Sequence, residues 1–176
     1  MASTGGERDL MSFGSQRWPT PGCMIAPVLL VIVGCNPNST RPPQLVPVTG
    51  AAQVELSLPR NRATQALADQ LKSDTIPVTV VQVEDGYLET PWFDATTGIA
   101  TEARPLGPNI VRLRAWIDPA SPQHSHITVE VVYRLLADPS SPGRSLDRQV
   151  PNDNPAAERT GRALETLAAR YPPRVG

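Results

Sequence analysis

The chain has 176 residues, 20 of them proline, and a formal net charge of −1 at pH 7. This near-zero charge argues against nucleic acid as a partner, because nucleic-acid binding needs a clustered basic face. The two cysteines, Cys23 and Cys35, both precede the predicted folded domain. That domain therefore has no thiol for a disulfide, a zinc cluster or a cysteine nucleophile.

An uninterrupted apolar run over residues 24–33 precedes Gly34-Cys35. It is too short to cross a bilayer, which needs about 20 apolar residues, and it has the length of a signal-peptide core. Ile32-Val33-Gly34-Cys35 resembles the lipobox of bacterial lipoprotein signals, in which the cysteine is diacylated and becomes the mature N-terminus. We therefore expect residues 1–34 to be a signal peptide and Cys35 to be lipidated. A buried core segment is the alternative interpretation.

The polar stretch before the apolar run is long for a signal peptide. Initiation at Met11 would leave Arg17 as the only charge before the run, so a true start at Met11 or later is an alternative to Met1. The resemblance to lipoproteins also implies a location. The residue after Cys35 is Asn36 rather than the aspartate that retains some lipoproteins in the inner membrane, so we expect anchoring in the outer membrane, facing the periplasm.

Residues 35–52 form a predicted lipid-anchored tether, because a proline-rich polar stretch cannot bury enough apolar surface to fold. Such a stretch favours an extended form that rises about 3.1 Å per residue. A single domain over residues 53–172 and a short tail over residues 173–176 follow.

The first half of the domain shows two hydrophobic periods. Apolar residues alternate with polar ones over residues 53–58, which predicts a half-buried strand. They recur at helical spacing over residues 61–73, with Asn61 as a candidate cap. A valine-rich strand (78–84), a turn at Asp85-Gly86, an extended segment (87–93) and a long loop (94–109) are predicted next.

The second half contains the clearest signals. Alternation over residues 111–117 and 127–135 predicts an antiparallel hairpin whose loose loop covers residues 118–125. A further loop is expected over residues 138–150. The last helix should be capped by Asp153 or Asn154 and end at Pro172. Gly161 and neighbouring alanines would let this helix lie close to the sheet.

The element order β-α-β-β-β-α predicts an α+β fold, a mostly antiparallel sheet with both helices on one face. This order, with the strand sequence Gly86-Tyr87-Leu88-Glu89-Thr90-Pro91-Trp92, resembles the helix-grip domains of BamC-type outer-membrane lipoproteins. The resemblance covers about residues 53–171. It implies an accessory, non-catalytic role in outer-membrane biogenesis or a related envelope complex. BamC-type proteins carry two such domains in tandem, whereas this chain has room for one.

A candidate partner surface lies on the predicted outer face of the sheet, away from the helices. Arg112, Arg114 and Trp116 share that side of one strand, and Arg134 shares it on the next. An exposed tryptophan among arginines is typical of a binding hot spot. Trp92 is expected to belong to the same surface. A solvated face of cross-strand ion pairs, or tryptophans buried in the core, are the alternatives.

No catalytic constellation emerges from the sequence, so we expect neither enzymatic activity nor a cofactor. His124 and His126 could share a strand side with Glu130, but two polar residues where a loop enters a strand are the simpler interpretation. Glu89 and Asp94 are expected to be solvated. A second functional hypothesis is a periplasmic binding module, in which the sheet and the last helix enclose an apolar or lipid-like ligand.

Overall fold

The computed structural model describes residues 46–102, 107–138 and 140–173. The predicted signal peptide, Cys35, the tether up to residue 45 and the last three residues of the tail lie outside these ranges. Within them, no helix is both long and apolar enough to cross a membrane.

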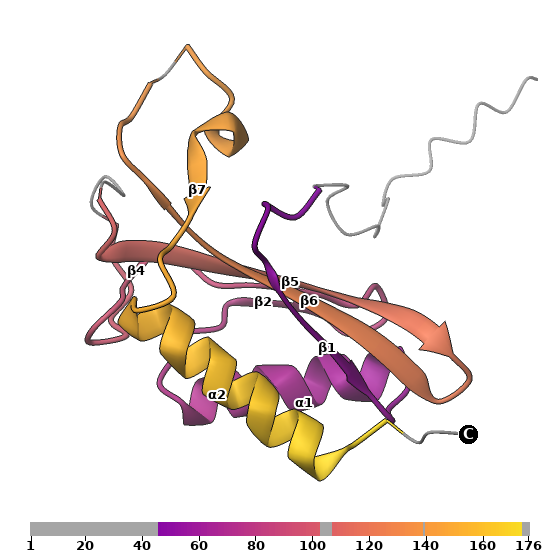
Figure 1. Ribbon diagram of the computed structural model, residues 1–176. Helices are drawn as coiled ribbons and strands as arrows, with labels where there is room; N and C mark the ends of the chain where they lie inside the picture. Colours follow the sequence, from indigo (N-terminus) through magenta and orange to yellow (C-terminus); the bar gives the residue numbers. More distant parts are fainter. Residues whose placement is uncertain (1–45, 103–106, 139, 174–176) are drawn as a thin grey trace, which may run out of the picture. The chain divides into compact units, whose positions relative to one another are not determined.

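The predicted α+β fold is confirmed. A seven-stranded sheet carries two helices on one face, and every strand pair in it is antiparallel (Figure 1). Five strands form its main path, in the order β1-β6-β5-β3-β2. The two short strands β4 and β7 pair with β5 and β6. The bounds are β1 Ala52–Leu56, α1 Arg60–Ser73, β2 Val80–Gln82, β3 Tyr87–Glu89, β4 Phe93–Asp94, β5 Ile110–Ser121, β6 His124–Arg134, η1 Gly143–Leu146 (a 3-10 helix), β7 Asp147–Gln149 and α2 Pro155–Arg170.

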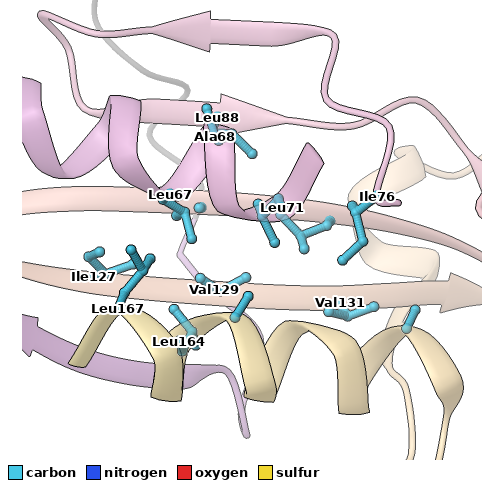
Figure 2. Close-up of a cluster of buried hydrophobic side chains, with 14 of the residues drawn as sticks. Leu67, Ala68, Leu71, Ile76, Leu88, Ile127, Val129, Val131, Leu164 and Leu167 are labelled. Carbon is cyan, nitrogen blue, oxygen red and sulfur yellow. The ribbon is translucent and has the colours of Figure 1, made fainter. Parts of the chain in front are cut away.

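The hydrophobic core lies between the helices and the inner face of the sheet. Leu67 and Leu71 of α1 and Leu167 of α2 are fully buried there. Figure 2 shows these side chains packed against alternate residues of β6, among them Ile127 and Val129. The predicted alternation places Ile127, Val129 and Val131 inward, because one face of a strand carries every second side chain. It fails at Leu135, the end of the predicted strand, which lies beyond β6 and is exposed.

The two helices begin differently. Asn154 is the N-cap of α2, as predicted, and its side chain accepts a hydrogen bond of 2.9 Å from the backbone N–H of Ala156. The prediction for α1 was wrong. Pro59 is its N-cap and makes no side-chain capping bond, while Asn61 lies inside the first turn. Proline fits there because its fixed φ suits an extended residue before a helix.

The β5–β6 hairpin is tighter than the predicted loose loop. Its strands extend to Ser121 and His124, so only Pro122 and Gln123 connect them. The proline at position 119 is tolerated inside β5 because β3 pairs with β5 only as far as Trp116. Beyond that residue, the outer edge of β5 needs no backbone donor for β3.

Gly86 closes the turn between β2 and β3. Its φ is +69°, and a Cβ atom there would collide with the carbonyl oxygen of Ile117. The Gly86 carbonyl in turn accepts a hydrogen bond of 2.8 Å from the Ile117 N–H. Only glycine allows both this backbone conformation and this close approach.

Residues before the predicted domain boundary at residue 53 already contact the domain. The backbone N–H of Val48 donates to the Glu130 carboxylate at 2.9 Å, and the Val46 carbonyl accepts a hydrogen bond from Arg144. The predicted loop over residues 138–150 likewise contains η1 and β7. These short pieces have no periodic pattern, and contacts with distant residues hold them.

Gly161 has a role different from the one expected. Apart from its chain neighbours and the backbone of α2 itself, no atom of the described residues lies within 4 Å of the position that a Cβ would take at Gly161, so this residue faces open space rather than touching the sheet. We expect Gly161→Ala to raise the free energy of unfolding by about 0.5–1 kcal/mol, because alanine is the better helix former. Urea unfolding of both chains measures this difference. A destabilised variant would mean that the helix does approach another element here.

Candidate functional site: the covered outer face of the sheet

Seven charged side chains meet on the face of the sheet opposite the helices, and we call them the ion cluster. The strands bring them together. Register places Glu89 of β3 opposite Arg114 of β5, and Arg114 opposite Glu130 of β6. Asp147 of β7 lies opposite Arg134 in the same way. The members are Glu89, Arg112, Arg114, Glu130, Arg134, Arg144 and Asp147.

Arg114 is the centre of the ion cluster. Its Nη1 atom lies 3.0 Å from Glu130 Oε1 and 2.9 Å from Asp147 Oδ2. Its Nε atom lies 3.4 Å from Glu89 Oε1. The side chains of Glu130 and Asp147 are completely buried. Burial alone would lower the pKa of Arg114, but hydrogen bonds to Asp147 and Glu130 outweigh it and leave that pKa raised.

Two segments of the chain cover this cluster. η1 brings in Arg144, whose Nη2 atom donates to Glu130 Oε2 at 2.8 Å, and β7 brings in Asp147. The stretch that leads into β1 supplies the Val48 N–H, a further donor to Glu130 beside Arg114 and Arg144. In Figure 1 both segments lie on the side of the sheet away from α1 and α2. The outer face is therefore closed here by the chain itself.

Trp92 packs at the margin of the ion cluster between β3 and β4. The guanidinium carbons of Arg112 and Arg134 lie 4.8 and 4.9 Å from its ring centre, within the range of cation–π attraction. Arg112 also forms an ion pair of 3.0 Å with Glu89. Its Nε atom is buried without a hydrogen-bond partner. Burial, reinforced by the neighbouring arginines, lowers the pKa of Arg112, although Glu89 opposes that change.

Tyr87 links the cluster to Trp116. Its hydroxyl donates to Glu89 Oε2 at 2.8 Å, and its ring centre lies 5.9 Å from that of Trp116. Burial raises the pKa of the Tyr87 hydroxyl, and the hydrogen bond to the Glu89 carboxylate raises it further. A phenolate beside this carboxylate would be repelled, so the folded domain keeps the phenol protonated.

This raised pKa predicts a loss of stability at high pH. The folded state holds the Tyr87 proton above about pH 10, where an unfolded tyrosine releases it, so the stabilisation present below that pH decreases as pH rises. We expect the free energy of unfolding of the wild type to fall more steeply than that of Tyr87→Phe between about pH 9 and about pH 11. Urea titrations across this range measure both slopes, and equal slopes would contradict the assignment.

The structure brings the predicted surface residues together but buries most of them. Trp92, Arg114 and Trp116 are 9%, 5% and 8% exposed. The predicted exposure of the outer face is therefore wrong at these positions, although the assignment of strand sides is right. Only Arg112 and Arg134 keep about a quarter to a fifth of their side chains open, at 26% and 21%. Glu89, expected to be solvated, is paired within the cluster.

The two histidines lie away from the cluster, near the hairpin end of β6. His124 Nδ1 is 3.6 Å from Glu55 Oε1, and His126 is opposite Asp118 across the hairpin. Among residues 46–102, 107–138 and 140–173, no group of three or more histidine, cysteine or acidic side chains is placed to hold a metal ion.

Asp94, the other carboxylate expected to be solvated, is the last residue of β4 and stabilises the loop that follows it. Its side chain accepts hydrogen bonds from Thr96 and Thr97, and those from Thr97 are the main cause of its lowered pKa.

A groove of about 400 Å³ lies beside α2, where β1 and β7 pair with different parts of the same edge of β6. Val129 and Val131 contribute to its lining, and Gly161 opens onto it. The Oε1 atom of Gln149, another lining residue, is buried without a hydrogen-bond partner. Charged residues of α2 also line the groove, namely Glu158, Arg162 and Glu165.

In comparisons with known proteins, no family model and no curated protein matches this chain.

Proposed function

We propose that this chain is a lipid-anchored, non-enzymatic protein of the bacterial cell envelope whose α+β domain docks on an envelope complex. One observation carries the proposal: the lipobox-like Ile32-Val33-Gly34-Cys35 at the end of a short apolar run. The resemblance to BamC-type lipoproteins supports outer-membrane biogenesis as the setting. The α+β fold with both helices on one face is compatible with that resemblance, but it is too general to establish the family.

The geometry of the domain supports a structural rather than a catalytic use of its charged residues. Glu89, Glu130 and Asp147 are all paired with arginines in the ion cluster. Arg144 and the Val48 N–H cover Glu130 from the outside. A general base has to reach its substrate directly or through one water molecule, and these carboxylates are already occupied by cations of the same chain.

The anchor would keep the domain close to the membrane surface. Val46, the first described residue, follows Cys35 by 11 residues. Even a fully extended chain of this length spans at most about 40 Å. The connection is shorter than the predicted tether, because residues 46–52 already contact the domain or belong to β1.

We expect Cys35 to carry the lipid. Cells that are fed a fatty-acid analogue should label the wild type, whereas Cys35→Ala should lose the label and accumulate as the uncleaved precursor, because the lipid group is attached through the cysteine sulfur. A Cys23→Ala variant is the matched control and should keep the label. Gradient fractionation of labelled membranes then distinguishes outer from inner membrane. An unlabelled, soluble wild type would overturn the proposal.

The docking part of the proposal needs a separate experiment. The wild type and Cys35→Ala are each captured from detergent-solubilised membranes, and the proteins that accompany them are compared. Recovery of the same stoichiometric envelope protein in repeated captures of the lipidated form supports docking. A lipidated chain that is monomeric in mild detergent, with no stoichiometric companion, contradicts it while leaving the anchor intact.

The groove beside α2 favours the second candidate, a periplasmic binding module. Its volume of about 400 Å³ falls within the usual range for small-molecule sites. The unpaired Gln149 Oε1 could accept a hydrogen bond from a ligand, and the charged lining suits a polar head better than a bare hydrocarbon chain. Filling the groove with Gly161→Leu would abolish ligand binding if the module exists, without affecting lipidation of Cys35.

A further inference from the structure

Three consecutive apolar residues lie exposed where β6 ends. Leu135 is 65% exposed, Leu136 is 53% exposed, and Ala137 is also exposed. Single exposed apolar side chains are common on protein surfaces. Two adjacent leucines that are both exposed are different, because no packing among the described residues requires them.

The fold holds these residues outward. Sheet pairing on β6 ends at Arg134, whose carbonyl accepts a 2.6 Å hydrogen bond from the Gly107 N–H and whose side chain bonds Asp147. A little further along, the Asp138 carboxylate accepts hydrogen bonds from the Ser140 N–H and the Ser141 hydroxyl. Residues 135–137 therefore lie between two segments that hydrogen bonds hold in place.

The chain segment that leads back to Cys35 contacts the same loop. Arg144 of η1, at the far side of the loop that begins with Leu135, donates to the carbonyl of Val46. Val46 is itself 83% exposed. The turn of the β5–β6 hairpin lies at the opposite end of β6, a strand of 11 residues. Eleven residues of strand span roughly 35 Å, so the two ends of β6 can be distinguished experimentally.

We infer that Leu135, Leu136 and Ala137 rest in the lipid–water interface of the membrane that holds the chain. This inference depends on the proposed lipidation of Cys35. A patch of three residues is far below the roughly 1,000 Å² that a stable protein–protein interface buries. It can be sufficient for a bilayer, because the acyl anchor already raises the local concentration of the domain at the membrane surface.

The test uses the full chain, purified in its lipidated form and reconstituted into vesicles of phosphatidylethanolamine and phosphatidylglycerol. Leu136→Cys and Ala120→Cys introduce single labelling sites, because acylation blocks Cys35 and Cys23 lies within the signal peptide. Ala120 is exposed near the hairpin turn and is the matched control. Each cysteine carries an environment-sensitive fluorophore, and brominated lipids act as the quencher.

We expect severalfold stronger quenching and a blue shift at position 136, with neither at position 120. Equal quenching at both positions would overturn the inference, as would a blue shift at 136 without bromolipid quenching, which indicates a protein contact instead. The mass of the N-terminal peptide and flotation with the vesicles report on the anchor independently. An acylated, floating chain with an unquenched 136 label removes this inference alone, whereas an unacylated chain removes the proposed function as well.

Discussion

Arg114→Ala is expected to lower the free energy of unfolding by about 3–5 kcal/mol, because it leaves Glu130 and Asp147 buried with their central cation missing. Both carboxylates are fully buried, and Arg114 Nη1 is within 3.0 Å of each. Urea unfolding followed by circular dichroism measures the loss. Removing one partner from a buried pair in this way is much more disruptive than breaking a pair on the surface.

Arg162→Ala is the matched control for this prediction. Arg162 forms only a 4.0 Å pair with Glu158 on the surface of α2, and its side chain is 64% exposed. We expect a change of less than about 0.5 kcal/mol. A second variant tests the pairing itself: in a Glu130→Gln background, Arg114→Ala should destabilise the domain less than it does in the wild type. Equal effects of Arg114→Ala and Arg162→Ala would show that the cluster is open to water.

Trp116→Ala is expected to destabilise the domain by about 3–5 kcal/mol, as truncation of a buried tryptophan does. Its side chain packs beside the Tyr87 ring, and the residue is only 8% exposed. Leu164→Ala in α2 is the comparison, with an expected loss of about 2–5 kcal/mol from the cavity in the core. Thermal unfolding of the two variants and the wild type gives the ranking.

This ranking decides what Trp116 does. An exposed hot-spot residue would change stability by no more than about 0.5 kcal/mol when truncated, while weakening the binding of a partner. A loss comparable to that of Leu164→Ala means that Trp116 contributes to packing. The structure favours packing, whereas the sequence pattern had favoured the exposed surface.

The strand faces could be read from the sequence because a strand places alternate side chains on opposite sides. Arg112, Arg114 and Trp116 indeed share the outer face. The segments that cover the outer face could not be predicted from the sequence. Asp147 and Arg144 reach the cluster from β7 and η1, segments of three and four residues with no periodicity of their own. Asp147 is placed by the pairing of β7 with Arg134 of β6, and Arg144 by its hydrogen bonds to Glu130, in both cases a dozen or more residues earlier in the chain.

The same contrast explains the helices and the ends of the strands. The helical period and the proline in the first turn locate α2 well, and Asn154 caps it through a local bond. The hairpin turn and the partner strand β4 were missed because they depend on neighbouring strands rather than on local sequence. Gly161 shows most clearly what the sequence does not reveal. A glycine in a predicted helix gives the same sequence pattern whether it faces a sheet or a groove.

The pairing of β1 with β6 also affects the order in which the domain can form. Register joins Ala52 to Val129, so the first strand of the chain closes an edge that appears only after most of the domain has been synthesised. Contacts between residues so far apart in sequence form slowly, because a long loop has to close before they are made. β5 and β6, by contrast, are neighbours in the chain and can pair early. Because synthesis begins at the N-terminus, the nascent chain would carry an unpaired β1 for most of its synthesis. The ion cluster could be completed only after β7 has been synthesised.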